Sequence, residues 1–195
     1  MKTKIFFLLF VIQCVFLFSQ NVENKKGFFN ISKLGVIAIS DAKLETFDST
    51  NGILVTDLEE SSNFGFSVQT INGFFISPDF SLGIGVGLDR YNNPSVNTMP
   101  LFLDTRYYLS ETSKSLYFLG NFGSLIKIEN GTRRGSMVNL GMGIKFPLKK
   151  GGSRTSVVSD ISFSHKSISL DGLPISDSTR FTRVNGIMLS LGLLF

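Results

Sequence analysis

Apolar residues recur at every second position through most of this chain, which is the periodicity of a β-strand and not of a helix. The stretch FSLGIGVGLD at residues 80–89 is the clearest example, because its apolar residues alternate with serine, glycine and aspartate. The segment MVNLGMGIKF at 137–146 repeats the pattern, and the chain closes on GIMLSLGLLF at 186–195. Alternate side chains of a strand point to opposite faces, so the sequence predicts a sheet with one apolar and one small or polar face.

The number and spacing of these segments predict a meander. We expect eight strands, at residues 27–40, 63–76, 80–91, 98–109, 116–128, 135–147, 154–168 and 181–195. Short, turn-like connections (SPD, SETSKS and LKKGGS) alternate with longer or more polar ones near 41–62, 92–97, 129–134 and 169–180. An up-and-down meander places every second connection at the same end, so short turns are predicted at one end and longer loops at the other.

The first twenty residues have the pattern of a secretory signal peptide. Lys2 and Lys4 precede an uncharged run at 5–18, and a polar stretch begins at Ser19. The run is shorter than the roughly 20 residues of a spanning helix, so a retained anchor helix is the less favoured alternative. We expect 1–20 to be cleaved and 21–195 to form one domain. The only cysteine, Cys14, would leave with the signal peptide, which excludes disulfides and thiolate chemistry.

Two kinds of eight-stranded barrel fit this alternation, a soluble one with an apolar interior and a transmembrane one with an apolar exterior. Charged residues make up only 17% of the chain, and the non-apolar strand face offers glycine, serine and asparagine where water would favour lysine and glutamate. The sequence therefore predicts an all-β, eight-stranded antiparallel up-and-down transmembrane β-barrel.

Charges of both signs fall on the predicted inner face. They are Asp89, Asp104, Arg106, Lys127, Lys145, Asp160 and Lys166. Because buried charges persist only when they are paired, we expect a filled lumen with internal ion pairs. Tyr91, Tyr107 and Tyr117 lie near predicted strand ends, where we expect an aromatic girdle at the membrane interface.

The last strand resembles the C-terminal signal by which the outer-membrane assembly machinery selects its barrel substrates. The match consists of Ile187, Leu189, Leu191, Leu193 and the terminal Phe195. With the signal peptide and the strand count, the mature chain resembles the small outer-membrane β-barrel proteins of the porin-like superfamily, which include eight-stranded adhesion and resistance barrels. The resemblance implies a place in the bacterial outer membrane with both termini periplasmic, and contact with the assembly machinery, membrane lipid and lipopolysaccharide.

One pair of side chains offers chemistry. His165, the only histidine, and Ser167 lie two residues apart, hence on one face, and the strand phase makes that the lipid face. The pair resembles the His-x-Ser element of the lipid A deacylases, eight-stranded outer-membrane esterases. The resemblance implies His165 as base and Ser167 as nucleophile. An acid is also needed to orient the imidazole, and Asp171 and Asp177 are the candidates in this chain.

The chain departs from the deacylase pattern at two places. That family follows its serine with asparagine, where this chain has Ile168, and takes its acid from a glutamate of the next strand, where residues 181–195 contain none. The sequence therefore favours a non-enzymatic structural or binding barrel with a filled lumen, and assigns no catalytic, cofactor-binding or metal-binding residues. An esterase using His165 and Ser167 and a narrow conduit for small solutes are the alternatives.

The remaining polar residues favour contact with lipid over nucleic acid. Basic residues are scattered and form no nucleic-acid footprint, and no histidine or carboxylate cluster has the spacing of a metal site. Arginines in or beside the later loops could pair with lipopolysaccharide phosphates: Arg133, Arg134, Arg180 and Arg183. Long loops on a rigid barrel are usual binding sites, so an extracellular ligand of unknown identity is also expected.

Overall fold

The computed structural model describes residues 27–48, 52–57, 64–92, 95–110, 114–127, 134–148, 155–169 and 178–195; the predicted signal peptide lies outside them. These residues form ten strands: β1 (Gly27–Asp48), β2 (Gly52–Asp57), β3 (Phe64–Phe75), β4 (Phe80–Tyr91), β5 (Val96–Thr98), β6 (Pro100–Tyr108), β7 (Ser115–Leu125), β8 (Gly135–Pro147), β9 (Ser156–Ser169) and β10 (Ser178–Leu194). The described residues include no helix that could cross a membrane.

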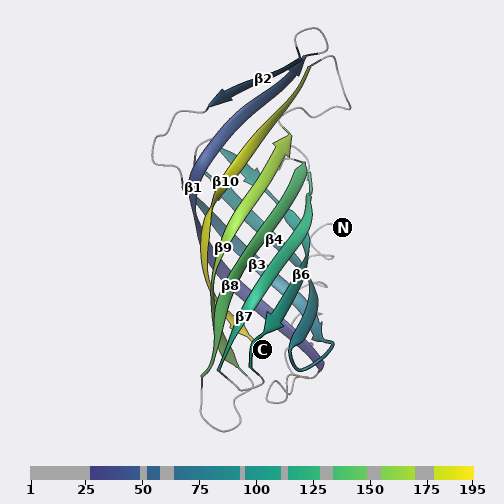
Figure 1. Ribbon diagram of the computed structural model, residues 1–195, viewed down its shortest axis with the longest axis vertical. Helices are drawn as coiled ribbons and strands as arrows, with labels where there is room; N and C mark the ends of the chain where they lie inside the picture. Colours follow the sequence, from purple (N-terminus) through teal and green to yellow (C-terminus); the bar gives the residue numbers. More distant parts are fainter. Residues whose placement is uncertain are drawn as a thin grey trace, which may run out of the picture.

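Eight of the strands close into a barrel (Figure 1). Neighbours in the order β1, β3, β4, β6, β7, β8, β9, β10 pair antiparallel, and β10 pairs back with β1 from Ile31↔Leu194 to Asp48↔Ser178. The predicted eight-stranded antiparallel barrel is confirmed. Closure leaves these eight strands without an open sheet edge over the barrel's height, as a structure in hydrocarbon requires.

The two ends of the barrel differ. The β3–β4, β6–β7 and β8–β9 connections lie at one end, where β1 begins and β10 finishes; we call this the turn end. At the opposite, loop end, β1 and β10 continue beyond the barrel and β2 pairs with the upper part of β1 (Figure 1). We call residues 41–48, 52–57 and 178–185 the projecting sheet.

Loops were predicted at 41–62 and 169–180, but parts of both segments form strands of the projecting sheet. The segment DAKLET at 41–46 itself alternates, but between charged and uncharged residues, so it lacks the apolar face by which the barrel strands were recognised. A bulge at Ser40 separates the two patterns, since Ile39 pairs with Gly186 and Asp41 with Asn185. A smaller difference is β5, which continues the line of β6 along β4 within the segment predicted as a loop at 92–97.

The exterior of the barrel is apolar on every strand, as predicted. On β4, Leu82, Ile84 and Leu88 are exposed while Ser81 and Asp89 are buried. The same alternation gives an outer belt that includes Leu34, Val36, Phe66, Val68, Ile84, Leu101, Leu103, Phe118, Phe122, Leu140, Met142, Ile161, Phe163, Ile187, Leu189 and Leu191. A continuous belt of exposed large apolar side chains is stable against lipid and not against water.

Glycines on the inner face make room for large lumen side chains. A Cβ at Gly73 would clash with the Phe29 ring, and one at Gly85 with the Phe102 ring. The small residues of the inner face are therefore packing partners of the aromatic rings that fill the narrow lumen.

Candidate functional site

Aromatic rings fill the lumen near the turn end. Phe29 packs against Phe75 with ring centroids 5.1 Å apart, Phe75 against Tyr108 at 5.6 Å, and Tyr108 against Tyr117 at 5.4 Å. The ammonium of Lys145 lies 5.9 Å from the centroid of the Tyr108 ring. These side chains come from β1, β3, β6, β7 and β8, so they obstruct the lumen from most sides.

A network of charged and polar groups around Asp104 and Asp160 lies next to these rings. Arg106 donates from Nε and Nη2 to the two carboxylate oxygens of Asp104, at 2.9 and 3.2 Å, and Asn121 Nδ2 donates to Asp104 Oδ2 at 2.8 Å. Asp160 accepts from Lys33 Nζ at 3.3 Å and Tyr117 OH at 3.1 Å, and from Ser190 Oγ. The Arg106 guanidinium lies 5.0 Å from the Tyr117 ring centroid. Because Tyr117 also donates to Asp160, this contact joins the groups around Asp104 to those around Asp160.

A second network lies nearer the loop end. Lys166 Nζ donates to Asp89 Oδ2 and to Tyr91 OH, each at 2.6 Å, and Thr98 Oγ1 donates to Asp89 Oδ2 at 3.3 Å. All four side chains are buried. These contacts connect β9 with β4 and β5 across the lumen, so side chains block the lumen at two heights.

The lumen agrees with the sequence prediction in most of its charges. Of the predicted inner charges, all but Lys127 are buried. Lys127 follows the end of β7 and is half-buried, because the strand stops at Leu125. The sequence reasoning missed Lys33, which lies on one of three predicted strands whose alternation is less regular.

The predicted tyrosine girdle is wrong for two of its three members. Tyr107 points outward and is 51% exposed, whereas Tyr91 and Tyr117 are buried in the lumen. The strand phase explains this, because Tyr91 is two residues from the inner Asp89 and Tyr117 is four from the inner Asn121. Phase is a better guide to the direction of a side chain than closeness to a strand end.

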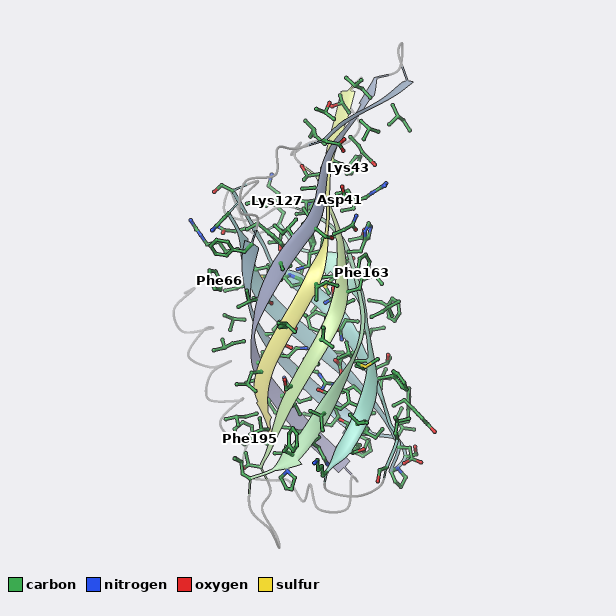
Figure 2. All side chains as sticks on the ribbon, turned by 60° about the vertical axis from the view of Figure 1, so that its left-hand side comes forward. Asp41, Lys43, Phe66, Lys127, Phe163 and Phe195 are labelled. Carbon is green, nitrogen blue, oxygen red and sulfur yellow. The ribbon has the colours of Figure 1, made fainter. Side chains whose placement is uncertain are left out.

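A polar cluster lies on the outside of the wall at the upper edge of the apolar belt. His165 and Ser167 face outward on β9 as predicted, and both are half-buried. His165 Nδ1 lies 2.6 Å from Asn185 Oδ1 on β10, and Asn185 Nδ2 donates to Asp41 Oδ2 on β1 at 3.1 Å. Figure 2 places Asp41 above Phe163, where the outer surface changes from apolar to charged.

The hydrogen bonds of this cluster determine the histidine tautomer. Asn185 turns its Nδ2 donor to Asp41, so its Oδ1 faces His165 and must accept the proton of Nδ1. In the neutral imidazole Nε2 is then the nitrogen without a proton, which is the tautomer a general base at that position needs. However, no hydrogen bond joins Ser167 to His165 among the described residues, and both proposed acids, Asp171 and Asp177, lie outside them.

Sequence reasoning missed Asn185 and Asp41 as neighbours of His165. The signal that could have found Asn185 is the β9–β10 register, in which Ile161 faces Leu189 and Phe163 faces Ile187. Counting on by two residues from each of these apolar pairs places Asn185 opposite His165. Placing Asp41 opposite Asn185 also requires knowing that β1 has a bulge at Ser40, and no sequence pattern indicated that bulge.

Comparison with known proteins supports the fold. The chain matches no family model and no curated protein. Its structure is similar to the crystal structure of the outer membrane protein OprG from Pseudomonas aeruginosa, with a TM-score of 0.54 and 8% sequence identity over 89% of this chain and 98% of that one. The predicted resemblance to small outer-membrane barrels is therefore confirmed at the level of the fold.

Weaker similarities are found to two other barrels. The solid-state NMR structure of outer membrane protein AlkL in lipid bilayers matches with a TM-score of 0.49 and 14% identity over 91% of this chain and 93% of that one. The crystal structure of Neisserial surface protein A matches with a TM-score of 0.44 and 13% identity over 87% of this chain and 98% of that one.

Proposed function

We propose that this chain is a structural or binding barrel of the bacterial outer membrane, without enzymatic activity and without a wide channel. The observation that carries the proposal is the combination of an apolar outer belt with a lumen blocked by two polar networks. Lipid is the solvent that such an exterior requires. A lumen crossed by paired charges leaves little space for solute.

The loop end is proposed to face the outside of the cell. Outer-membrane barrels of this class keep short turns in the periplasm and longer segments outside. In that orientation the part of the projecting sheet that includes β2 stands clear of the membrane, and the start of β1 and the end of β10 lie on the periplasmic side, as expected for periplasmic termini. Recognition by the assembly machinery is supported by the exposed row Ile187, Leu189 and Leu191.

Lipopolysaccharide is the proposed lipid partner at the loop end. Arg90 on β4, Arg134 before β8 and Arg183 on β10 are exposed close to the upper edge of the apolar belt. Arg183 is held by Glu45, with Nη2 2.9 Å from Oε1. Guanidinium groups bind phosphate by paired, charge-assisted hydrogen bonds, and lipid A phosphates lie at this depth of the membrane. Arg133 and the Arg180 side chain lie outside the described part.

Two measurements test the barrel proposal. The mature chain, residues 21–195, should insert into lipid or detergent micelles and migrate in electrophoresis as a heat-modifiable barrel. In planar bilayers it should give no conductance of porin size, because Arg106, Asp104, Lys33 and Asp160 occupy the lumen. Stable porin-sized pores would contradict the filled lumen, and full solubility without detergent would contradict the membrane location.

A lipid A esterase is the second candidate function, favoured by the chain of contacts from His165 through Asn185 to Asp41. In that reaction His165 Nε2 would take the Ser167 proton while Oγ attacks the ester carbonyl, and would return it to the leaving alkoxide; water would then hydrolyse the acyl-serine. A neutral asparagine can hold the tautomer but stabilises the imidazolium less than a carboxylate does. Because no hydrogen bond joins Ser167 to His165 among the described residues, the esterase ranks behind the non-enzymatic barrel.

A further inference from the structure

The free edge of β2 is a feature that the proposed function does not use. β2 pairs with β1 from Lys43↔Asp57 to Asp48↔Gly52, and no described strand pairs with its other side. All six of its residues are exposed, with Ile53 and Leu54 at 67% and Val55 at 51%. An exposed apolar strand edge is a template for another strand, and proteins usually protect such edges with charge, proline or a cover.

The ladder determines which peptide groups of β2 face this edge. Asn30 and Phe195 exchange both backbone hydrogen bonds, at 3.1 and 2.8 Å, and the antiparallel alternation continues from that pair along β10. We followed this alternation along β10 past the bulge at Ser40, and then across β1 to β2. It leaves every second peptide group of β2 facing the free edge. The N–H and C=O groups left facing the free edge are those of Ile53, Val55 and Asp57.

We propose that β2 pairs antiparallel with β2 of a second copy of this chain, about a two-fold axis through Val55. In that register the two Val55 residues face each other, and Ile53 of each copy faces Asp57 of the other. The two carboxylates lie at opposite ends of the ladder while apolar residues meet at its centre, so the strand is complementary to itself. The inference rests on the proposed function, which places the loop end outside the cell.

The symmetry determines which copies can meet. The two-fold axis of an antiparallel strand pair is perpendicular to its sheet, and the projecting sheet rises as a continuation of the barrel wall (Figure 1). The axis is therefore roughly parallel to the membrane, and rotation about it reverses the barrel. Paired copies belong to facing membranes, so the contact joins two cells. A six-residue strand makes a small contact, and adhesion depends on many copies acting together.

Cell mixing tests this pairing. Two populations of bacterial host cells, labelled with different fluorescent proteins, express the full chain and are mixed. We expect co-aggregates to form several times more often than between non-expressing cells. Non-expressing cells added to the mixture should stay outside the aggregates, because both strands of the contact come from this chain.

Two substitutions at one position separate backbone pairing from general stickiness. Val55→Pro removes an N–H group that faces the free edge, which an edge strand tolerates, and should reduce aggregation to the level of non-expressing cells. Val55→Thr keeps the N–H group and the β-branched shape and should retain most of the aggregation. Both variants should fractionate with the outer membrane and remain heat-modifiable like the wild type.

The outcomes distinguish this proposal from the barrel proposal. Loss of membrane fractionation by the wild type would refute the membrane barrel. With the barrel in the outer membrane, an absence of aggregation, or equal aggregation by Val55→Pro, would overturn the strand pairing. Aggregates that recruit non-expressing cells would assign the edge to a different surface partner and would overturn it as well.

Discussion

The Lys33 ammonium on β1 lies 3.3 Å from the Asp160 carboxylate on β9, and both side chains are only 1% exposed. These strands are not neighbours, because β10 lies between them and pairs with both. The ion pair therefore spans the strand that closes the barrel. Since a buried charge is stable only with its partner, the pair also favours the closed arrangement over an open sheet.

Removing Lys33 should destabilise the barrel. Lys33→Met leaves the Asp160 carboxylate buried without its nearest cation, which should lower the free energy of unfolding by about 3 kcal/mol. Urea unfolding of the lipid-inserted barrel, followed by loss of the heat-modifiable band, measures the change. The control is Lys43→Met, in a half-exposed pair with Asp41 at 3.6 Å, which should cost less than about 1 kcal/mol. Equal costs for the two variants would contradict the cross-lumen role of Lys33.

Deleting Phe195 should reduce assembly. The deletion removes the terminal ring and the two backbone hydrogen bonds with Asn30, so it weakens both recognition and the β10–β1 seam. We expect protease-sensitive periplasmic protein in place of membrane-integrated barrel. Phe195→Ala keeps the backbone pairing and removes only the ring, so it isolates recognition of the aromatic side chain. Normal integration of the deletion variant would contradict the signal interpretation.

The rim arginines should contribute to lipopolysaccharide binding. Replacing Arg90, Arg134 and Arg183 together by glutamine should weaken the thermal stabilisation that added lipopolysaccharide gives to the micelle-bound barrel. Lys114→Gln, at the turn end, serves as the control and should leave that stabilisation unchanged. An equal effect of lipopolysaccharide on the triple variant and the wild type would exclude these arginines as phosphate ligands.

The esterase candidate predicts a set of variants with one common effect. If His165 and Ser167 hydrolyse lipid A, Ser167→Ala and His165→Ala should each abolish fatty acid release, and Asn185→Ala should lower kcat more than it changes KM. Under the non-enzymatic proposal the wild type releases none, as mass spectrometry of lipid A can establish. Deacylation that disappears in both alanine variants would make Ser167 the nucleophile.

The barrel was predictable because lipid imposes one rule on every strand that crosses it. Leu189 and Leu191 must face outward whatever the protein does, and their alternation is visible without a structure. That rule ends at the membrane surface. Ala42 and Leu44 alternate with charged residues and do not belong to an apolar row that faces lipid. The upper part of β1 was therefore predicted as a loop. The contact between His165 and Asn185 depends on strand register, which alternation within a single segment does not contain.

The bulge at Ser40 changes which residues of β1 face inward, odd-numbered ones below it and even-numbered ones above it. Below it, odd-numbered residues such as Lys33 and Ile37 point inward; above it, Ala42 takes the inner face while Asp41 and Lys43 point outward. Because Ile39 faces inward and Asp41 outward, loss of Ser40 would join two segments whose side chains already alternate, and both the barrel wall and the projecting sheet would keep their faces. The bulge is therefore a position where β1 tolerates the loss of one residue, whereas a single insertion in a regular part of β1 would turn the residues beyond it to the opposite face.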